Sequence, residues 1–198
     1  MKGGIFTPIL EYLLKGVSLI TTKSLEDVAY YQETTAFVNF VKSYEYEAGM
    51  NYTNIIITGH SLGGGLAMIS GAQSKVPAIA LSGPNAVLSR RTFSPTVSLE
   101  ALDKYTFNIV PDRDIVPRLD DLAQNYQRIK CRSGLSDPIS CHFGARSLCE
   151  VLLQCGSKGR PIPCKCARAY EDIYTDSLVE SVFNSGETLD QECPKVIK

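Results

Sequence analysis

Residues 54–66 read NIIITGHSLGGGL, and this stretch decides the fold. Three isoleucines followed by a threonine are typical of a short buried parallel strand. A serine flanked by glycines comes next, with Gly59, Ser61 and Gly63 in the pattern G-x-S-x-G. From Leu62 to Ser74 the residues are mostly small or apolar and include no proline. The stretch therefore predicts a strand over residues 54–58, a tight turn, and a helix packed closely on a sheet.

This order of elements around a G-x-S-x-G serine predicts a nucleophile elbow, in which the serine hydroxyl attacks a substrate. The backbone of the serine is strained, and we expect a side chain at position 59 or 63 to collide with the strand or the helix. The strain holds the Ser61 hydroxyl clear of the sheet. The helix points its amide end at a developing oxyanion, and the N–H of Leu62 is the expected donor.

Two simpler interpretations of the glycine-rich turn are weaker. A chance occurrence does not explain why β-branched residues precede the motif and a helical pattern follows it. A phosphate-binding loop requires a Gly-Lys-Ser/Thr ending, which the sequence lacks.

A serine nucleophile needs an adjacent base, usually a histidine oriented by a carboxylate. The chain has two histidines. His60 adjoins the serine inside the turn, where its side chain is expected to project away from the hydroxyl, so we interpret it as structural. His142 precedes a predicted helix over residues 144–154 and is therefore the predicted base.

The acid is expected between the serine and the histidine in the chain, at the end of a later strand. A predicted strand over residues 105–110 (YTFNIV) runs into a segment with two aspartates. Asp112 and Asp114 are both candidates on position alone. The remaining aspartates of this region are interpreted as solvated loop charges: Asp103, Asp120, Asp121 and Asp137.

Further elements complete an α/β pattern. We predict a helix over residues 24–46 that Ser24 and Asp27 open as a capping box and Gly49 stops. Strands are predicted at 77–81 and, on an edge, at 125–131; residues 5–20 form a weak helix or a loop. Strands that alternate with helices predict a mostly parallel sheet flanked by helices. Residues 1–156 would form one domain, with 157–198 as its cysteine-containing, loop-like extension.

Composition and charge exclude some classes of protein. The 198 residues are 44% hydrophobic, which is normal for a chain with a buried core. A formal net charge of -1 gives no general attraction to nucleic acid. No stretch reaches the roughly 20 apolar residues of a membrane span. The first 16 residues are interrupted by Pro8, Glu11 and Lys15 and do not form a secretory signal.

All seven cysteines lie after residue 130. We expect disulfides, which indicate a secreted protein or one in the lumen of an endomembrane or vacuolar compartment. The odd number leaves at least one cysteine unpaired or paired outside the chain. The alternatives are free thiols or a zinc site that uses Cys164 and Cys166, although their C-x-C spacing is tighter than usual for zinc.

Three segments together resemble the class 3 (fungal-type) lipase family of the α/β-hydrolase superfamily: IIITGHSLGGGLA, AIALSGPNA and RDIVPRL. In that family the catalytic aspartate directly precedes an apolar residue and Val-Pro, which selects Asp114 over Asp112. The segment CHFGARSLCEVLLQCG is similar to the histidine region of some vacuolar or secreted members and implies His142 as the base. The resemblance covers roughly residues 28–156.

The family pattern also includes an upstream strand with an Arg-Gly-Thr-like loop, which supplies a second oxyanion donor, and a lid helix. No segment within the 60 residues before Ser61 matches this pattern. We therefore expect a partial α/β-hydrolase fold in a chain truncated at its N-terminus.

The resemblance implies a serine carboxyl-ester hydrolase, a lipase that cleaves acylglycerol or phospholipid esters in lipid catabolism. It would need no metal or organic cofactor and would make peripheral contact with a lipid surface. A close variant is an esterase for soluble or cell-wall esters. The alternatives from other classes are a non-catalytic remnant that binds lipid or a protein partner, and an interaction module stabilised by cysteines or zinc.

Overall fold

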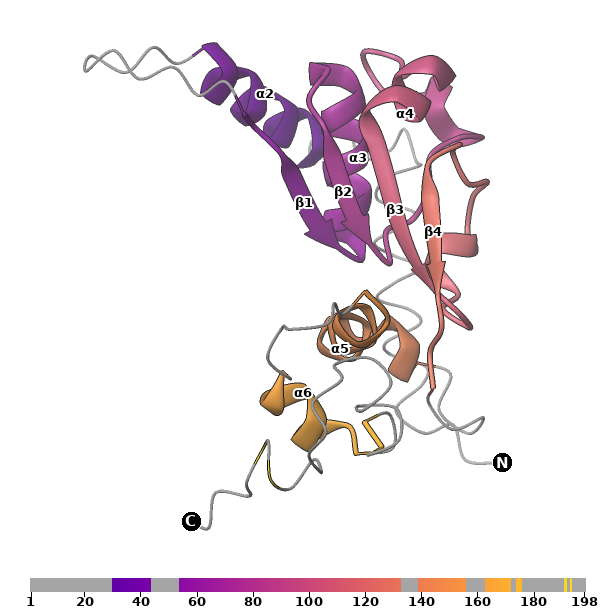
Figure 1. Ribbon diagram of the computed structural model, residues 1–198. Coiled ribbons are helices and arrows are strands. Elements are labelled where there is room, and N and C mark those ends of the chain that lie inside the picture. The colour runs from indigo at the N-terminus through magenta and orange to yellow at the C-terminus, as the bar shows by residue number, and fades with distance from the viewer. Residues whose placement is uncertain are drawn as a thin grey trace, which may run out of the picture. The chain divides into compact units, whose positions relative to one another are not determined.

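The computed structural model describes residues 30–43, 54–132, 139–155, 163–171, 174–175, 191 and 193. Contacts within the chain divide it into two compact units (Figure 1). The first unit comprises Met1–Val110 and Ile115–Gln127, and the second comprises Pro111–Asp114 and Arg128–Lys198. The predicted domain boundary at residue 156 stays a prediction, and the element predicted over residues 5–20 lies outside the described residues.

A four-stranded parallel sheet forms the centre of the fold. Its strands lie in the order β1 (Ile57–His60), β2 (Ala78–Leu81), β3 (Thr106–Pro111) and β4 (Tyr126–Ile129). The pairs β1–β2 and β2–β3 are parallel. The N–H of Asn108 donates to Asn125 O and that of Asp112 to Ile129 O, so the pairing of β3 and β4 advances in the same direction on both strands. This confirms the predicted α/β class.

The first strand lies later in the chain than predicted. The prediction covered residues 54–58, whereas β1 runs from Ile57 to His60. A strand begins where its backbone pairs with a neighbouring strand. Ile57 is paired with Ala78, the first residue of β2, and the N–H of Ile57 donates to the carbonyl of Pro77 at 2.9 Å. Ile56, just before the ladder, is 62% exposed.

Three α-helices accompany the sheet in the part of the first unit that the structure describes. α3 (Leu62–Ser74) packs on β1 and β2, and both α2 (Tyr30–Ser43) and α4 (Leu99–Tyr105) pack on α3. α3 has the predicted bounds. α2 lies within the helix predicted over 24–46, and α4, capped by the hydroxyl of Ser98, is not among the predicted elements. The core between these helices consists of Ile69, Ala72, Ala86, Phe93, Val97 and Leu102.

Glycines let α3 approach the sheet closely, as predicted. A Cβ at Gly71 would lie 2.6 Å from the Cβ of Ala78. A Cβ at Gly64 would lie 2.9 Å from the Cα of Gly83 and 3.2 Å from the Cβ of Ala80. Small residues on both sides of this contact therefore fix the depth at which α3 sits on β2.

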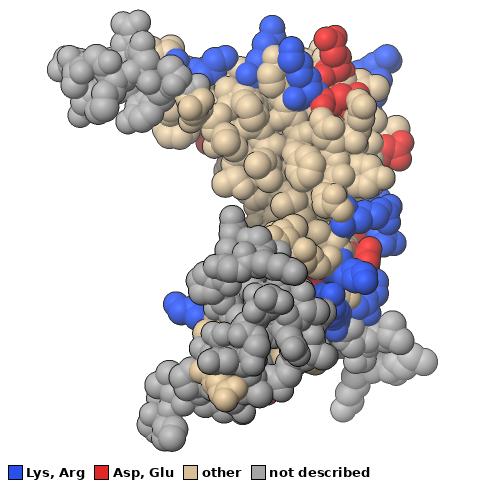
Figure 2. All heavy atoms as spheres, in the orientation of Figure 1, with Lys and Arg blue, Asp and Glu red and all other residues tan. Residues whose placement is uncertain are grey.

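The opposite face of the sheet carries exposed apolar side chains. Ile79 on β2 pairs in register with Phe107 on β3, and both are more than a third exposed. Figure 2 shows this face, which is turned to the viewer in Figure 1, without Lys, Arg, Asp or Glu across β1, β2 and β3. Among the described residues of this unit, no helix covers it.

The second unit is cross-linked by disulfides. It contains η4 (Ser140–His142), α5 (Gly144–Gln154) and α6 (Cys164–Ala169), and α5 has the predicted bounds. Six of its described residues form a hydrophobic core cluster: Cys149, Leu153, Cys166, Ala167, Tyr174 and Cys193. The predicted loop around residues 164–169 is a short helix instead. The N–H groups of Cys166 and Ala167 donate to the Pro163 carbonyl, and two residues within this turn, Cys164 and Cys166, are held by disulfides.

Three disulfides join Cys131 to Cys141, Cys149 to Cys166, and Cys164 to Cys193, and Cys155 is an exposed free cysteine. The disulfide prediction is confirmed, and the zinc alternative at positions 164 and 166 is wrong because both sulfurs are bonded. Such a set of disulfides is compatible with an extracellular or lumenal protein.

The helices that the structure describes include none with the length and apolar character needed to cross a membrane.

Tyr174 is the largest fully buried side chain among the described residues and is 1% exposed. Its hydroxyl donates to the carbonyl of Cys149 at 2.8 Å. Burial raises the pKa of Tyr174 from 10.0 to about 12; the carboxylate of Glu150 adds to the increase and the guanidinium of Arg132 opposes it. The neutral phenol is therefore the form that the folded state favours.

We predict that the stability of this unit depends on pH through Tyr174. Because its folded-state pKa lies above its unfolded value of 10.0, its contribution is complete below pH 10 and is lost as the pH rises toward 12. The free energy of unfolding should fall by about 1.4 kcal/mol per pH unit within this window. In Tyr174→Phe, which cannot ionise at this position, urea denaturation should show a shallower fall. Equal slopes in the two proteins would contradict the assignment.

Candidate active site

Ser61 lies in the turn between β1 and α3, with φ 56 and ψ -128. A positive φ is rare for a residue with a side chain, so the backbone is strained as the motif predicts. The N–H of Ser61 donates to the carbonyl of Leu81 at 3.0 Å, and its own carbonyl accepts from the N–H groups of Gly64 and Gly65. The end of β2 and the first turn of α3 therefore both fix this residue.

The two glycines of the motif have different roles. A Cβ at Gly59 would lie 2.2 Å from the carbonyl oxygen of Gly63 and 2.8 Å from the nitrogen of Gly64, so only glycine fits. A Cβ at Gly63 would meet nothing within 4 Å. The expected collision is confirmed at Gly59 and wrong at Gly63. The crowding is one-sided because the strand meets the backbone of the helix, and the missing Cβ of Gly63 would point away from that contact.

Leu62 is the first residue of α3. The first N–H groups of a helix have no acceptor within the helix, and this end carries a partial positive charge. The N–H groups of Gly64 and Gly65 already donate to Ser61 O, so the N–H of Leu62 is the amide next to the serine that this bonding leaves for another acceptor. The arrangement is suited to stabilising a negative charge beside the serine hydroxyl.

Asp114 and His142 are in contact. The Nδ1 atom of His142 lies 3.1 Å from each carboxylate oxygen of Asp114. Asp114 is completely buried and His142 is 8% exposed. An ionised carboxylate only accepts hydrogen bonds, so the proton is assigned to Nδ1, which leaves Nε2 as a hydrogen-bond acceptor and a potential base.

The two aspartates left open by sequence position differ in their surroundings. Asp114 follows a turn in which its N–H donates to the carbonyl of Pro111, and its carboxylate contacts His142. Asp112 is only partly buried, and its N–H belongs to the sheet through Ile129 O. His60 is exposed at the end of β1, on the same face of the strand as Thr58.

The predicted site residues thus form two halves. Ser61 and Leu62 belong to the first unit, and Asp114 and His142 belong to the second. The first half offers a hydroxyl on a strained turn beside a helix N-terminus. The second half offers an imidazole oriented by a buried carboxylate. A hydroxyl and an oriented imidazole are the two groups that a serine hydrolase combines.

A buried hydrogen-bond network of asparagine side chains lies in the first unit and is not among the predicted features. Asn108, 2% exposed on β3, donates to the carbonyl of Gly83 at 2.9 Å and to Oδ1 of Asn85 at 3.1 Å. Asn85 in turn donates to the carbonyl of Pro117. The network ties the segment that follows Asp114 in the chain to the loop after β2. A polar residue within the apolar run YTFNIV was the available sequence signal.

A serine on an elbow between a parallel strand and a helix, within an α/β sheet, defines the α/β-hydrolase class of fold. A family model described as "Lipase (class 3)" matches residues 10–123, more than half of the chain. The chain belongs to the class 3 lipase family, as the resemblance implied, and this is a family of carboxylic ester hydrolases. The match includes Ser61 and Asp114 and ends before His142. Searches of curated proteins and of solved structures gave no significant match.

We predict opposite outcomes for alanine at the two motif glycines. Gly59→Ala should lower the free energy of unfolding by about 3 kcal/mol or more, because the new methyl group meets rigid backbone. Gly63→Ala should change it by less than about 1 kcal/mol, because the methyl group points into open space and alanine favours the helix. Urea denaturation of both variants measures the difference. Similar losses in the two would show that the crowding is not one-sided.

Proposed function

We propose that this chain is a serine carboxyl-ester hydrolase, a lipase that cleaves acylglycerol or phospholipid esters in lipid catabolism. The observation that carries the proposal is the strained Ser61 at the N-terminus of α3 in a member of the class 3 lipase family. The contact between Asp114 and His142 supports it, because it supplies the oriented base that a serine nucleophile needs.

In the proposed mechanism, Ser61 Oγ attacks the carbonyl carbon of the ester while His142 Nε2 takes its proton. Asp114 holds the Nδ1 proton and stabilises the imidazolium, and the N–H of Leu62 donates to the oxyanion. The tetrahedral intermediate collapses, and the alcohol leaves with the proton from His142. A water molecule, deprotonated by the same imidazole, then releases the fatty acid and regenerates the serine. No metal or organic cofactor takes part.

The proposed place of action is a lipid surface in an oxidising compartment. The three disulfides support secretion or residence in an endomembrane or vacuolar lumen. Peripheral contact with lipid follows from the substrate class, since acylglycerols and phospholipids are presented at an interface.

We predict that Ser61→Ala lowers the hydrolysis of a short-chain chromogenic ester by about 10⁵- to 10⁶-fold, because the nucleophile is removed. The variant should keep the circular dichroism spectrum and the unfolding midpoint of the parent chain. An unreduced rate in the purified variant would contradict the assignment of Ser61. A parent chain that binds lipid vesicles without any turnover would instead favour the non-catalytic alternative.

We predict unequal effects for the two neighbouring aspartates. Asp114→Asn should lower kcat by about 10⁴-fold, because an amide no longer selects the Nδ1-protonated tautomer of His142. Asp112→Asn, the matched control two residues away, should lower kcat by only a small fraction of that factor. Steady-state kinetics on the same ester measures both. A larger loss in the Asp112 variant would assign the acid to that residue instead.

A further inference from the structure

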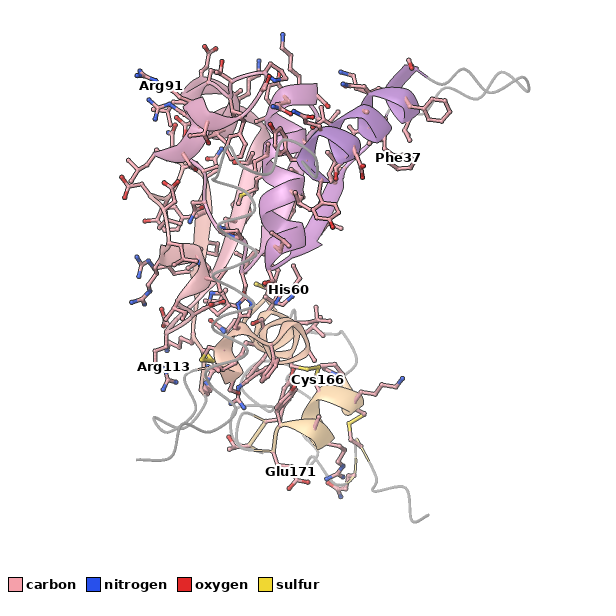
Figure 3. All side chains as sticks on the ribbon, turned by 180° about the vertical axis from the view of Figure 1, so that it is seen from behind. Phe37, His60, Arg91, Arg113, Cys166 and Glu171 are labelled. Atoms are coloured by element: carbon pink, nitrogen blue, oxygen red, sulfur yellow. A yellow bond between two sulfur atoms is a disulfide. The ribbon has the colours of Figure 1, made fainter. Side chains whose placement is uncertain are left out.

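One residue of the second unit contacts the neighbours of both Asp114 and His142. The sulfur of Cys131 is bonded to Cys141, which directly precedes His142. The carbonyl of Cys131 accepts a hydrogen bond from the guanidinium of Arg113, which directly precedes Asp114. Figure 3 labels Arg113, and a disulfide lies close to it.

The contact with Arg113 holds a strained turn. Arg113 has φ 67, in the left-handed region that residues with side chains rarely adopt. The turn closes with a hydrogen bond from the N–H of Asp114 to the carbonyl of Pro111 at 3.2 Å. The hydrogen bond from Arg113 to Cys131 stabilises this conformation. It thereby helps to fix the position of Asp114, the next residue in the chain.

The disulfide holds the other member of the pair. Cys141 is fully buried, and its carbonyl accepts from the hydroxyl of Ser147 at 2.9 Å. The N–H of His142 donates to the carbonyl of Ile139 at 2.8 Å. The short helix that carries His142 is therefore fixed at Cys141 by a covalent bond on one side and by α5 on the other.

Cys131 is itself held firmly on α5. On one side of it, Lys130 N–H donates to Gln154 Oε1 at 2.9 Å, and the amide of Gln154 returns a bond to the carbonyl of Lys130. On the other side, Arg132 N–H donates to Glu150 Oε1 at 2.6 Å, and the guanidinium of Arg132 pairs with the second carboxylate oxygen. Glu150 is completely buried. Charged hydrogen bonds of this kind are among the stronger ones.

We propose that Cys131 is a positioning residue that sets the separation of Asp114 and His142. Its sulfur fixes one partner and its carbonyl fixes the other, and both act from a segment clamped to α5. A misplacement of about 1 Å in a catalytic arrangement can lower the rate by about 10²-fold. The kinetic consequence rests on the proposed function, whereas the positioning itself is measured on His142.

The first experiment reads the tautomer of His142 by ¹⁵N NMR of the imidazoles, which is simple because the chain has two histidines. In the parent chain we expect His142 protonated at Nδ1. In C131A/C141A, which removes the disulfide without leaving a thiol, we expect a mixture of tautomers. C164A/C193A removes a disulfide remote in sequence from Asp114 and His142 and should leave the parent tautomer. An unchanged tautomer in folded C131A/C141A would overturn the proposal.

The second arm uses Arg113→Ala, which keeps the disulfide and therefore decides the question if C131A/C141A does not fold. It removes the other contact with Cys131, and we expect the same mixture of tautomers. A parent-like tautomer in this variant, when C131A/C141A gives no folded protein, would overturn the proposal.

Kinetics then separate positioning from general destabilisation. C131A/C141A should lower kcat by about tenfold to 10²-fold with a smaller change in KM, and C164A/C193A should leave kcat within about twofold. In the Asp114→Asn background, removal of the disulfide should not lower kcat further, because both changes act through the contact between Asp114 and His142. Additive losses would contradict positioning. If Ser61→Ala kept full turnover, the proposed function would fail, and the NMR result would still decide the role of Cys131.

Discussion

The approach of Gly59 to the carbonyl of Gly63 is the contact on which the first unit depends. Strand and helix meet so closely there that no Cβ fits at position 59. The chain can reverse within this space only if the residue between them takes a positive φ, and that residue is Ser61. The strain at the serine and the position of the α3 N-terminus beside it therefore have one cause. The same close approach continues along α3, where Gly71 lies against Ala78.

The second unit is stabilised in a different way, through disulfides. Among its described residues, the core cluster has six members, and three of them are disulfide cysteines. Small domains that bury little apolar surface commonly depend on disulfides. The third disulfide ends at Cys141, which directly precedes His142, the proposed base. We therefore propose that a disulfide of this unit both stabilises the fold and helps to position the imidazole.

The sequence predicted those parts of the fold that have a local signal. The bounds of α3 and α5 follow from residue patterns that each helix contains within itself. α4 and α6, with seven and six residues, are too short for a helical period to show. The predicted bounds of β1 were too early in the chain because they depend on where β2 begins. Ser61 and His142 followed from motif and elimination, Asp114 needed the family resemblance, and the bond from Arg113 to Cys131 joins residues that carry no shared pattern.

We propose that Ser61 is a nucleophile activated by its surroundings. The most direct measurement is to treat the chain with a fluorophosphonate, digest it, and locate the adduct by peptide mass spectrometry. We predict a single phosphonylated residue, Ser61, in the peptide that contains GHSLGGG. The absence of any adduct on folded protein, or an adduct on another serine, would contradict it.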